Sequence, residues 1–302
     1  MLRNLKINSP SYQLTFLSSS LFSVRMMIGA VHSLYLLSTG VSLPNLATLQ
    51  IVYSATVFLF ELPTGIVADM YSRRSSIVAA CISLFLFYLF CTFSPNLYLL
   101  MISEFFYGIG LCLISGALVT WQNDLARSEF PDDLMMINKL TYLKNEWSSI
   151  GSMLLATLGA FLVGFYSNTF IFIYFTCATL MLLLAYLFSK IKCTPSMTKE
   201  NRPGHRDYYK QIIHSLKADL SNKTGLIYMS IACLLVLIYQ PIFHYWQPLF
   251  IELGKNELSF NNDIQKSGIL LGMVFAVKSI FTYFFNRSAR KWITSKSSPY
   301  TI

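Results

Sequence analysis

The stretch ELPTGIVADMYSRR, residues 61–74, carries two acidic and two basic side chains beside a proline and a glycine. It directly follows IVYSATVFLF, residues 51–60, an apolar run typical of a helix buried in lipid or in a protein core. An apolar helix that ends in so dense a cluster of mixed charge needs an explanation. The composition and the charge pattern of the rest of the chain provide it.

The composition is that of a membrane protein. Of 302 residues, 54% are hydrophobic and only 12% are charged, and the mean hydropathy is +0.52. Soluble domains carry about 25% charged residues, so this chain has too few charges to cover a soluble surface. The six cysteines form no C-x-x-C pair and predict neither a disulfide framework nor a zinc site. We expect no metal and no cofactor.

Eight apolar segments are long enough to cross a bilayer, since a hydrocarbon core of about 30 Å needs about 20 residues of helix. Helices are expected because lipid offers backbone groups no hydrogen-bonding partners. The predicted fold class is therefore all-α, a polytopic transmembrane helical bundle. The eight segments are 16–39, 46–64, 76–93, 97–120, 142–165, 168–189, 225–250 and 267–286.

The charges between these segments alternate from one link to the next. Arg3 and Lys6 precede the first segment, Arg73 and Arg74 follow the second, and the loop 190–223 is strongly basic. The intervening links VSLPN, SPN and YSNT carry no charge. By the positive-inside rule, this pattern places both termini in the cytoplasm of a multi-pass protein, expected in the plasma (inner) membrane. The same rule accounts for the basic loop without a nucleic-acid partner.

The chain divides at this basic loop. We expect residues 1–190 to form a six-span N-terminal bundle, residues 191–223 a basic cytoplasmic linker, and residues 224–302 a partial C-terminal bundle of two spans. A six-span block closed by a basic linker suggests a unit that is normally repeated. The two spans after the linker would begin the second unit.

The charged cluster of residues 61–74 then lies in the cytoplasmic link between the second and third spans. Gly65 permits close helix approach, and Pro63 breaks or bends the end of the second span. Asp69 and Arg73 stand four residues apart, so their side chains would face each other on a continued helix. Arg73 and Arg74 also anchor the link to the cytoplasmic face.

This cluster resembles the signature of the major facilitator superfamily, a family of membrane transporters. That signature occupies the same link and reads glycine, a small apolar pair, alanine, aspartate and, after a position or two, Gly-Arg-Arg or Gly-Arg-Lys. The chain has GIVADMYSRR at residues 65–74, with Ser72 in place of the second glycine. The preceding Glu61-Leu62-Pro63-Thr64 matches the lead-in of many members. The resemblance extends over residues 10–290 approximately.

The resemblance implies a secondary transporter that moves a small molecule by alternating access through a cavity between helical bundles. In the family, the aspartate at the position of Asp69 reaches the eleventh span and steadies the outward-facing state. The fourth span has Glu104 and Tyr107 where many members have arginine and glutamine, so proton coupling is a hypothesis that the resemblance does not support. The predicted cytoplasmic gate motif comprises Glu61, Pro63, Gly65, Asp69, Arg73 and Arg74.

Members of the family usually have twelve spans, and eight are predicted here. The alternative interpretation is an inactive, truncated transporter, or a membrane partner protein with no transport of its own. If the eight-span chain is complete, transport would require an oligomer or a second subunit. An enzyme is not expected, because the sequence contains no H-E-x-x-H and no G-x-S-x-G motif. The expected partners are the lipid bilayer, an unidentified small molecule and, if transport is coupled, protons.

Charged side chains inside spans cost about 2.5 to 3.5 kcal/mol on insertion scales, so each needs a partner or a function. We predict that Arg25 in the first span and Glu104 in the fourth approach each other across the cavity. They would form either a static buried pair or a pair for which a substrate or a proton competes. His32, deeper in the first span, belongs to the residue type that ordinarily titrates near neutrality, although a hydrogen-bonded helix residue is the simpler interpretation.

Three further candidates lie in the last two spans. Gln240 and His244 stand one turn apart in the seventh span, where two prolines bracket aromatic residues. Transporters use such broken helices to line binding sites. An aromatic belt at the membrane interface explains Tyr245 and Trp246 at least as well. Lys278 in the eighth span points either into the cavity or toward a neighbouring helix.

A second cluster of mixed charge follows the fourth span. A solvated loop is its simpler interpretation, and a part in the cytoplasmic gate is the alternative that its position in the family suggests. Its residues are Asp124, Arg127, Glu129, Asp132 and Asp133.

Overall fold

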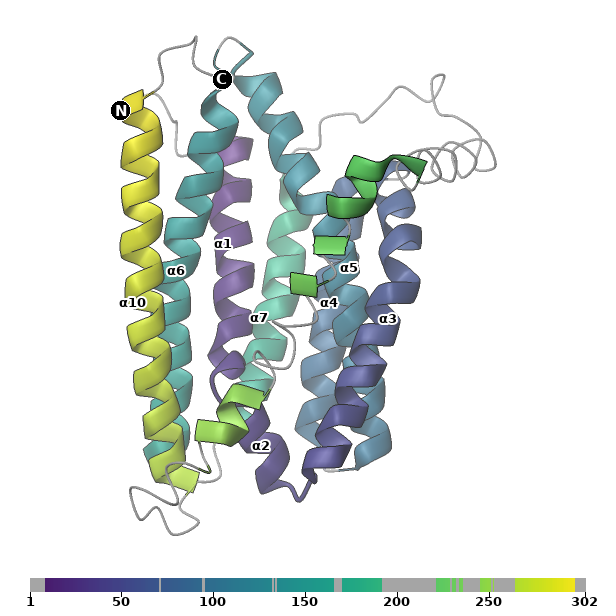
Figure 1. The fold of residues 1–302 in the computed structure, drawn as a ribbon, viewed down its shortest axis with the longest axis vertical. Helices are drawn as coiled ribbons and strands as arrows, with labels where there is room; N and C mark the ends of the chain where they lie inside the picture. The colour runs from purple at the N-terminus through teal and green to yellow at the C-terminus, as the bar shows by residue number, and fades with distance from the viewer. Residues whose placement is uncertain are drawn as a thin grey trace.

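The computed structural model is a bundle of long helices that stand side by side, with a short helix, α2, at one end (Figure 1). It describes residues 9–70, 72–93, 96–131, 133, 135–165, 170–191, 221–228, 230–231, 234–235, 245–250, 252 and 264–296. The main helices in these ranges are α1 (Pro10–Gly29), α2 (His32–Ser38), α3 (Leu43–Met70), α4 (Arg73–Phe93), α5 (Leu97–Glu129), α6 (Met135–Phe165), α7 (Phe170–Lys190) and α10 (Ile264–Lys296).

The all-α transmembrane prediction is confirmed. Seven helical segments of the described chain are long and apolar enough to cross a membrane, and they correspond to the first six predicted spans and the eighth. The predicted seventh span, residues 225–250, falls largely outside the described residues. Seven apolar spans make the chain an integral, multi-pass membrane protein.

Two helices extend further than predicted. α5 continues to Glu129 and α6 begins at Met135, so the link between them is short. The solvated-loop interpretation of the charged cluster after the fourth span is therefore wrong for Asp124, Arg127 and Glu129, which are helical. Polar residues can continue a helix beyond the lipid, because hydropathy marks the hydrocarbon boundary and not the helix end.

The first span is broken in the middle. α1 ends at Gly29 and α2 begins at His32, and Val31 between them has φ −132° and ψ 5°, outside the helical region. No proline lies at this point. The sequence predicts one continuous span over 16–39, so the break differs from the prediction. The break leaves backbone groups at both new helix ends without partners inside their own helix.

α1 and α6 pack closely through small residues. A Cβ atom at Gly159 would lie 2.3 Å from the backbone oxygen of Met27, and one at Gly151 would lie 2.2 Å from Oγ of Ser23. Since both glycines lie on α6 and both contacted residues on α1, only side chains as small as hydrogen allow this separation of the two helices. The hydroxyl of Ser23 donates to the carbonyl of Ser19, which satisfies it within its own helix.

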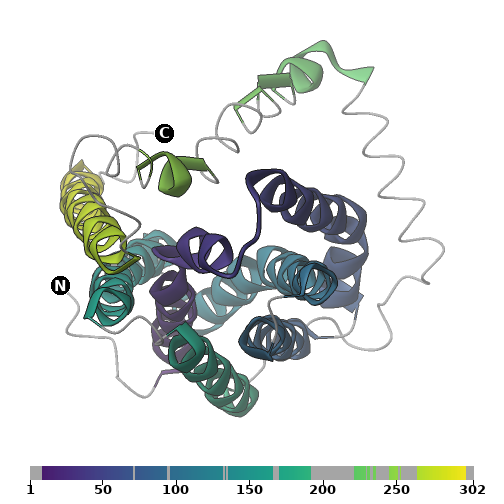
Figure 2. The same ribbon diagram turned by 90° about the horizontal axis from the view of Figure 1, so that it is seen from below.

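α10 lies along α6, on the far side of the bundle from α3 (Figure 2). Gly268 and Gly272 of α10 face Ala160 of α6, where added Cβ atoms would meet Ala160 at 3.2 and 2.8 Å. Two glycines four residues apart form one small-residue face, which lets helices approach in lipid. The last described helix is thereby attached to the same bundle as the first six spans.

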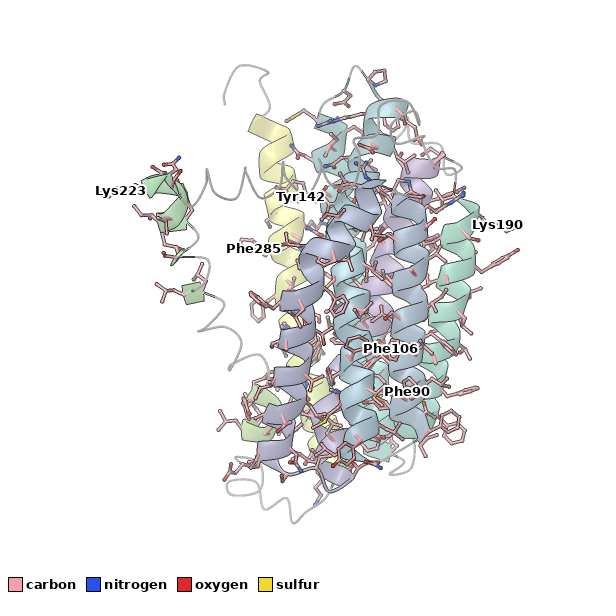
Figure 3. All side chains as sticks on the ribbon, turned by 90° about the vertical axis from the view of Figure 1, so that its right-hand side faces the viewer. Phe90, Phe106, Tyr142, Lys190, Lys223 and Phe285 are labelled. Atoms are coloured by element: carbon pink, nitrogen blue, oxygen red, sulfur yellow. The ribbon has the colours of Figure 1, made fainter. Side chains whose placement is uncertain are left out.

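Aromatic rings fill the contact between α4 and α5 and also cover the outside. Phe90 and Phe106 stack with centroids 5.7 Å apart, and Figure 3 shows them between these two helices. On the outside, Phe58, Phe172 and Phe285 are 83%, 72% and 76% exposed. Apolar side chains this exposed on helix after helix fit a lipid-facing surface.

Candidate functional site

A cavity of about 380 Å³ lies among helices from both ends of the chain. Its size falls in the range of about 300 to 1,000 Å³ that small-molecule sites occupy. It is lined by Arg25, Met26, Ile28, Gly29, His32, Ser33, Leu36, Leu46, Gln50, Tyr53, Phe87, Tyr88, Glu104, Tyr107, Leu111, Tyr245, Trp246, Gln247, Phe275 and Lys278. These residues come from α1 to α5, from the helical turn 245–250 and from α10.

The cavity occupies the half of the bundle away from the gate motif. Gln50 and Glu104 lie in the first third of α3 and α5, whereas Asp69 and Asp124 lie near the ends of the same helices. The cavity and the charged cluster are therefore separate sites at opposite ends of shared helices.

The structure brings together four of the residues predicted for a cavity or coupling site. Arg25, His32, Glu104 and Lys278 all line the cavity, although they come from four different helices. The predicted candidates Gln240 and His244 lie outside the described residues. Within the described ranges, no group of His, Cys, Asp or Glu side chains is arranged to hold a metal ion.

Arg25 is bound by aromatic side chains and not by an acid. Its Nη2 donates to the hydroxyl of Tyr107 at 2.9 Å, and its guanidinium carbon lies 5.4 Å from the Tyr107 ring centroid and 5.6 Å from that of Phe22. None of the ion pairs among the described residues includes Arg25, and its buried Nε has no acceptor there. A guanidinium within a membrane span thus faces the cavity with hydrogen-bonding capacity left over.

Glu104 is paired with His32. Its Oε1 lies 3.4 Å from Nε2 of the imidazole, and the carboxylate side chain is only 5% exposed. The other ring nitrogen of His32, Nδ1, lies 2.6 Å from the hydroxyl of Tyr174. Both Arg25 and Glu104 line the cavity as predicted, but among the described ion pairs Glu104 faces His32 and not Arg25.

The register of antiparallel helices explains why Glu104 pairs with His32 and not with Arg25. On α5, Tyr107 follows Glu104 by three residues and so lies on the same face, nearly one turn away. On α1 and α2, Arg25 precedes His32, so the earlier residue meets Tyr107 and the later one meets Glu104. Sequence spacing gives the face of each helix but not this vertical register.

Gln247 was not among the predicted residues, yet it joins the two halves of the first span. Its Nε2 donates to the carbonyl of Gly29 at 2.5 Å, and its Oε1 accepts from the backbone N–H of Ser33 at 3.2 Å. These are backbone groups that the break exposes at the end of α1 and the start of α2. The side chain is 5% exposed and also lines the cavity.

Lys278 and its aromatic neighbours form the opposite wall of the cavity. The ammonium nitrogen lies 4.9 Å from the ring centroid of Phe275, which in turn contacts Trp246 with centroids 5.8 Å apart. Lys278 lines the cavity. Trp246 lines the cavity as well.

At the other end of the bundle, Arg73 connects α4 with α3 and α5. Its Nη1 forms an ion pair with Asp124 and lies 3.4 Å from the carbonyl oxygen of Thr120, and its Nη2 lies 3.8 Å from Asp69. The predicted facing of Asp69 and Arg73 is confirmed, but it occurs across a break between α3 and α4 and not along one helix. Asp124 supplies the closer carboxylate, so the charged cluster on α5 contributes to this site.

The remaining gate residues tie helix ends together. Ser72, which stands where the family signature has glycine, accepts from the N–H of Ser75 at 3.4 Å and so caps the start of α4. Arg74 donates to the carbonyl of Ile191 at 3.3 Å, just beyond the end of α7. Glu61 accepts from the hydroxyl of Ser115 at 2.6 Å.

A further carboxylate closes the same end of the bundle. Glu129, at the end of α5, accepts from the backbone N–H of Ser11 at 3.0 Å and from its hydroxyl at 2.5 Å. Ser11 lies in the first turn of α1, where unpaired N–H groups and the helix dipole favour a negative charge. α5 is thus bound to α4 through Asp124 and to α1 through Glu129.

The gate residue Gly65 meets no atom within 4 Å of the place where a Cβ would stand. The close helix approach expected at Gly65 is instead made possible by Gly116 of α5. A Cβ at Gly116 would lie 3.2 Å from the Cα of Gly65. Pro63 was predicted to break or bend the second span; it lies inside α3, which continues past it to Met70, so the helix is not broken at the proline.

Comparison with known proteins agrees with this geometry. Over residues 14–297, the chain matches the model of the Major Facilitator Superfamily. It is 26% identical over 246 residues to a protein of Bacillus subtilis (strain 168) described as the uncharacterized MFS-type transporter YxaM. The match includes 81% of this chain and 57% of the relative, so the chain spans little more than half the relative's length. The chain therefore belongs to the major facilitator superfamily.

Proposed function

We propose that this chain is a secondary transporter that binds a small solute in the 380 Å³ cavity and moves it by alternating access. The observation that carries the proposal is the convergence of charged side chains from distant helices on one cavity. Arg25, Glu104 and Lys278 are each costly within a span, and a solute site is a function that would justify all three.

The second element of the proposal is a gate at the opposite end. There, Arg73 binds carboxylates of α3 and α5, and Glu129 binds the start of α1. While these contacts hold, the helix ends are joined and the cavity lies beyond them. Their release would open the route to the cavity from that end, which is the change that alternating access requires.

We propose the orientation that follows from the distribution of basic residues. The gate end would face the cytoplasm, both termini would lie there, and the membrane would be the plasma (inner) membrane. Residues 1–190 would form the first unit, 191–223 the basic linker and 224–302 the part of the second unit that supplies Lys278. Glu61, Pro63, Gly65, Asp69, Arg73 and Arg74 would then belong to the cytoplasmic gate.

Proton coupling is proposed for the pair of His32 and Glu104. With a neutral imidazole, Nε2–H points at the carboxylate while Nδ1 accepts from Tyr174, and with a charged imidazole the contact becomes a buried ion pair. A change of charge at this pair would alter how strongly α2 is held to α5.

Sided labelling of a cysteine in the cavity tests alternating access without knowledge of the solute. The variant Ser33→Cys places a thiol on the cavity wall with a minimal change of volume, in a background without the six native cysteines. Oriented vesicles are treated with a membrane-impermeant thiol reagent from one side or the other. Ser42→Cys and Ser189→Cys, exposed at opposite ends of the bundle, define the two sides.

Alternating access predicts that Ser33→Cys reacts from both sides, at rates that change in opposite directions when the gate is weakened. Arg73→Gln should raise the rate from the gate side and lower it from the other. Lys139→Gln is the matched control, because it removes an ion pair, with Asp133 at 2.8 Å, that joins no two helices of the gate. Reaction from one side alone in every variant would refute alternating access and favour a non-transporting membrane protein.

A further inference from the structure

We propose that the solute is an organic anion with a planar aromatic body, held between Arg25 and Lys278. This inference rests on the proposed transport function and assigns the substrate class of the same cavity. Two cations, from α1 and α10, line the cavity, and Glu104 is the one carboxylate among its described lining residues.

The charges of the cavity are not balanced by the protein. Glu104 already faces His32, while the ion pairs in the described ranges include neither Arg25 nor Lys278. The buried Nε of Arg25 lacks an acceptor among the described residues. An anionic group of the solute would supply this acceptor, and a planar carboxylate can take two parallel hydrogen bonds from a guanidinium.

The position of the two cations also favours an anion. Arg25 belongs to the first span and Lys278 to the last described helix, so one anion between them would draw together helices from the two ends of the chain. Binding would then be coupled to the relative position of these helices, because each cation loses its partner when they separate. A neutral solute would offer neither cation a charge.

Aromatic rings form the walls on both sides. Tyr107 contacts Tyr53 and Phe87 with centroids 5.5 and 4.7 Å apart, and Trp246 contacts Phe275 with centroids 5.8 Å apart. An aromatic cage would ordinarily suit a cationic solute. Here, however, Arg25 already lies over Tyr107 and Lys278 over Phe275, so these ring faces are taken and a third cation would be repelled. The remaining ring edges and faces suit a planar aromatic body.

The test is binding of 2-naphthoate to the purified full chain in lipid nanodiscs, with empty nanodiscs as the blank. Tritiated 2-naphthoate is displaced with its unlabelled form, with the neutral isostere 2-naphthamide and with the cation 2-naphthylmethylammonium. We expect saturable binding of 2-naphthoate, with the amide and the ammonium competing about tenfold more weakly or worse, as the loss of a charge-assisted hydrogen bond predicts. This comparison requires no variant, so it does not depend on the folding of a mutant.

Two pairs of matched variants locate the binding site. Arg25→Gln and Lys278→Gln should each weaken binding by about tenfold, and Arg25→Lys should weaken it less than Arg25→Gln, because lysine keeps the charge but cannot make two parallel hydrogen bonds. Arg287→Gln is the control for Arg25→Gln. Arg287 also donates to a tyrosine hydroxyl, that of Tyr283 at 2.7 Å, and lies over the ring of Tyr283, but outside the cavity. Lys190→Gln is the control for Lys278→Gln, since Lys190 lies over Tyr186 at the end of α7 (Figure 3).

Three results would each overturn the anion assignment: equal competition by the three naphthyl compounds, unchanged binding in both cavity variants, or no saturable binding. Labelling of Ser33→Cys separates this failure from failure of the proposed transport function. If the thiol reacts from both sides and 2-naphthoate does not bind, transport stands and the substrate class falls. If 2-naphthoate binds as expected and the thiol reacts from one side, the chain binds anions without alternating.

Discussion

The side-chain amide of Gln247 donates to the carbonyl of Gly29 at 2.5 Å, at the point where the first span is broken. The same amide accepts from the N–H of Ser33 on the other side of the break. In lipid, a helix interruption is tolerated only where its free backbone groups find other partners, and Gln247 supplies them from a distant part of the chain. The amide therefore holds α2, and with it His32, in position at the cavity.

Replacement of Gln247 should destabilise the protein through these backbone groups. Gln247→Ala leaves the carbonyl of Gly29 and the N–H of Ser33, both partly buried, without this partner, which costs up to about 1 to 3 kcal/mol for each group. Gln247→Glu should be nearly as harmful, because a carboxylate can accept from Ser33 but cannot donate to Gly29. The measurement is thermal unfolding of the purified full chain in nanodiscs.

The exposed Gln13 of α1 provides the control for this experiment. Gln13→Ala should leave the melting temperature almost unchanged. A melting temperature for Gln247→Glu close to that of the wild type would show that Gln247 acts by filling space and not by donating to the broken helix.

The break itself could not be predicted from the sequence. Around it the chain reads Gly29-Ala30-Val31-His32, with no proline and with apolar residues that continue a helix in most membrane proteins. The backbone groups at the break are bonded by Gln247, more than 200 residues later, whose single amide among aromatic residues forms no motif. Spans that were predicted correctly had a local cause, namely about 20 apolar residues bounded by polar links.

Glu104→Gln should remove a pH dependence of the cavity. In this variant the partner of His32 is neutral, so a change of charge on the imidazole no longer makes or removes an ion pair. The rate at which Ser33→Cys is labelled should depend on pH, and Glu104→Gln or His32→Gln should flatten this profile. Rates are divided by those of Ser42→Cys, which corrects for ionisation of the thiol.

Glu61→Gln is the matched control for this profile. Glu61 accepts from Ser115 and lies on α3 outside the cavity lining, so its neutralisation should leave the pH dependence intact. Persistence of the full transition in both Glu104→Gln and His32→Gln would exclude this pair as the proton-sensitive element.

A charge exchange tests the ion pair of Arg73 and Asp124. Arg73→Asp and Asp124→Arg should each raise labelling of Ser33→Cys from the gate side, by up to about fivefold, because partly exposed ion pairs contribute up to about 1 kcal/mol. The double variant restores opposite charges across α4 and α5 and should return the rate toward that of the parent. Rates in the double variant as high as in the single variants would show that the pair does not hold the gate.

The two contacts of Arg73 at the gate could be predicted from the sequence to different degrees. The contact of Asp69 with Arg73 agrees with the prediction from their spacing, although it forms across the break between α3 and α4 and not along one helical turn. The contact of Arg73 with Asp124 needed the length of α5, which extends beyond the apolar segment and carries Asp124 to the end of α4. The cavity illustrates the same limit: hydropathy identified Arg25, Glu104 and Lys278 as costly residues, but helix register decided that His32 would be the partner of Glu104.

Replacement of two glycines by alanine should affect stability differently. At Gly159, an added Cβ would lie 2.3 Å from the backbone oxygen of Met27, so α1 and α6 would have to separate. Gly159→Ala should therefore lower stability by about 1 to 3 kcal/mol. At Gly65 no atom lies within 4 Å of the added Cβ, so Gly65→Ala should unfold at the temperature of the parent protein.

This contrast also shows what Gly65 does for transport. If Gly65→Ala is as stable as the parent but labels Ser33→Cys more slowly from the gate side, the space at Gly65 is needed in a conformation other than the one described, when the helices of the gate have moved. If labelling and stability are both unchanged, Gly65 has no part in the gate and the motif acts through its charges. A loss of stability in Gly65→Ala would instead contradict the open space beside α3, and thermal unfolding in nanodiscs, measured beside Gly159→Ala, distinguishes these results.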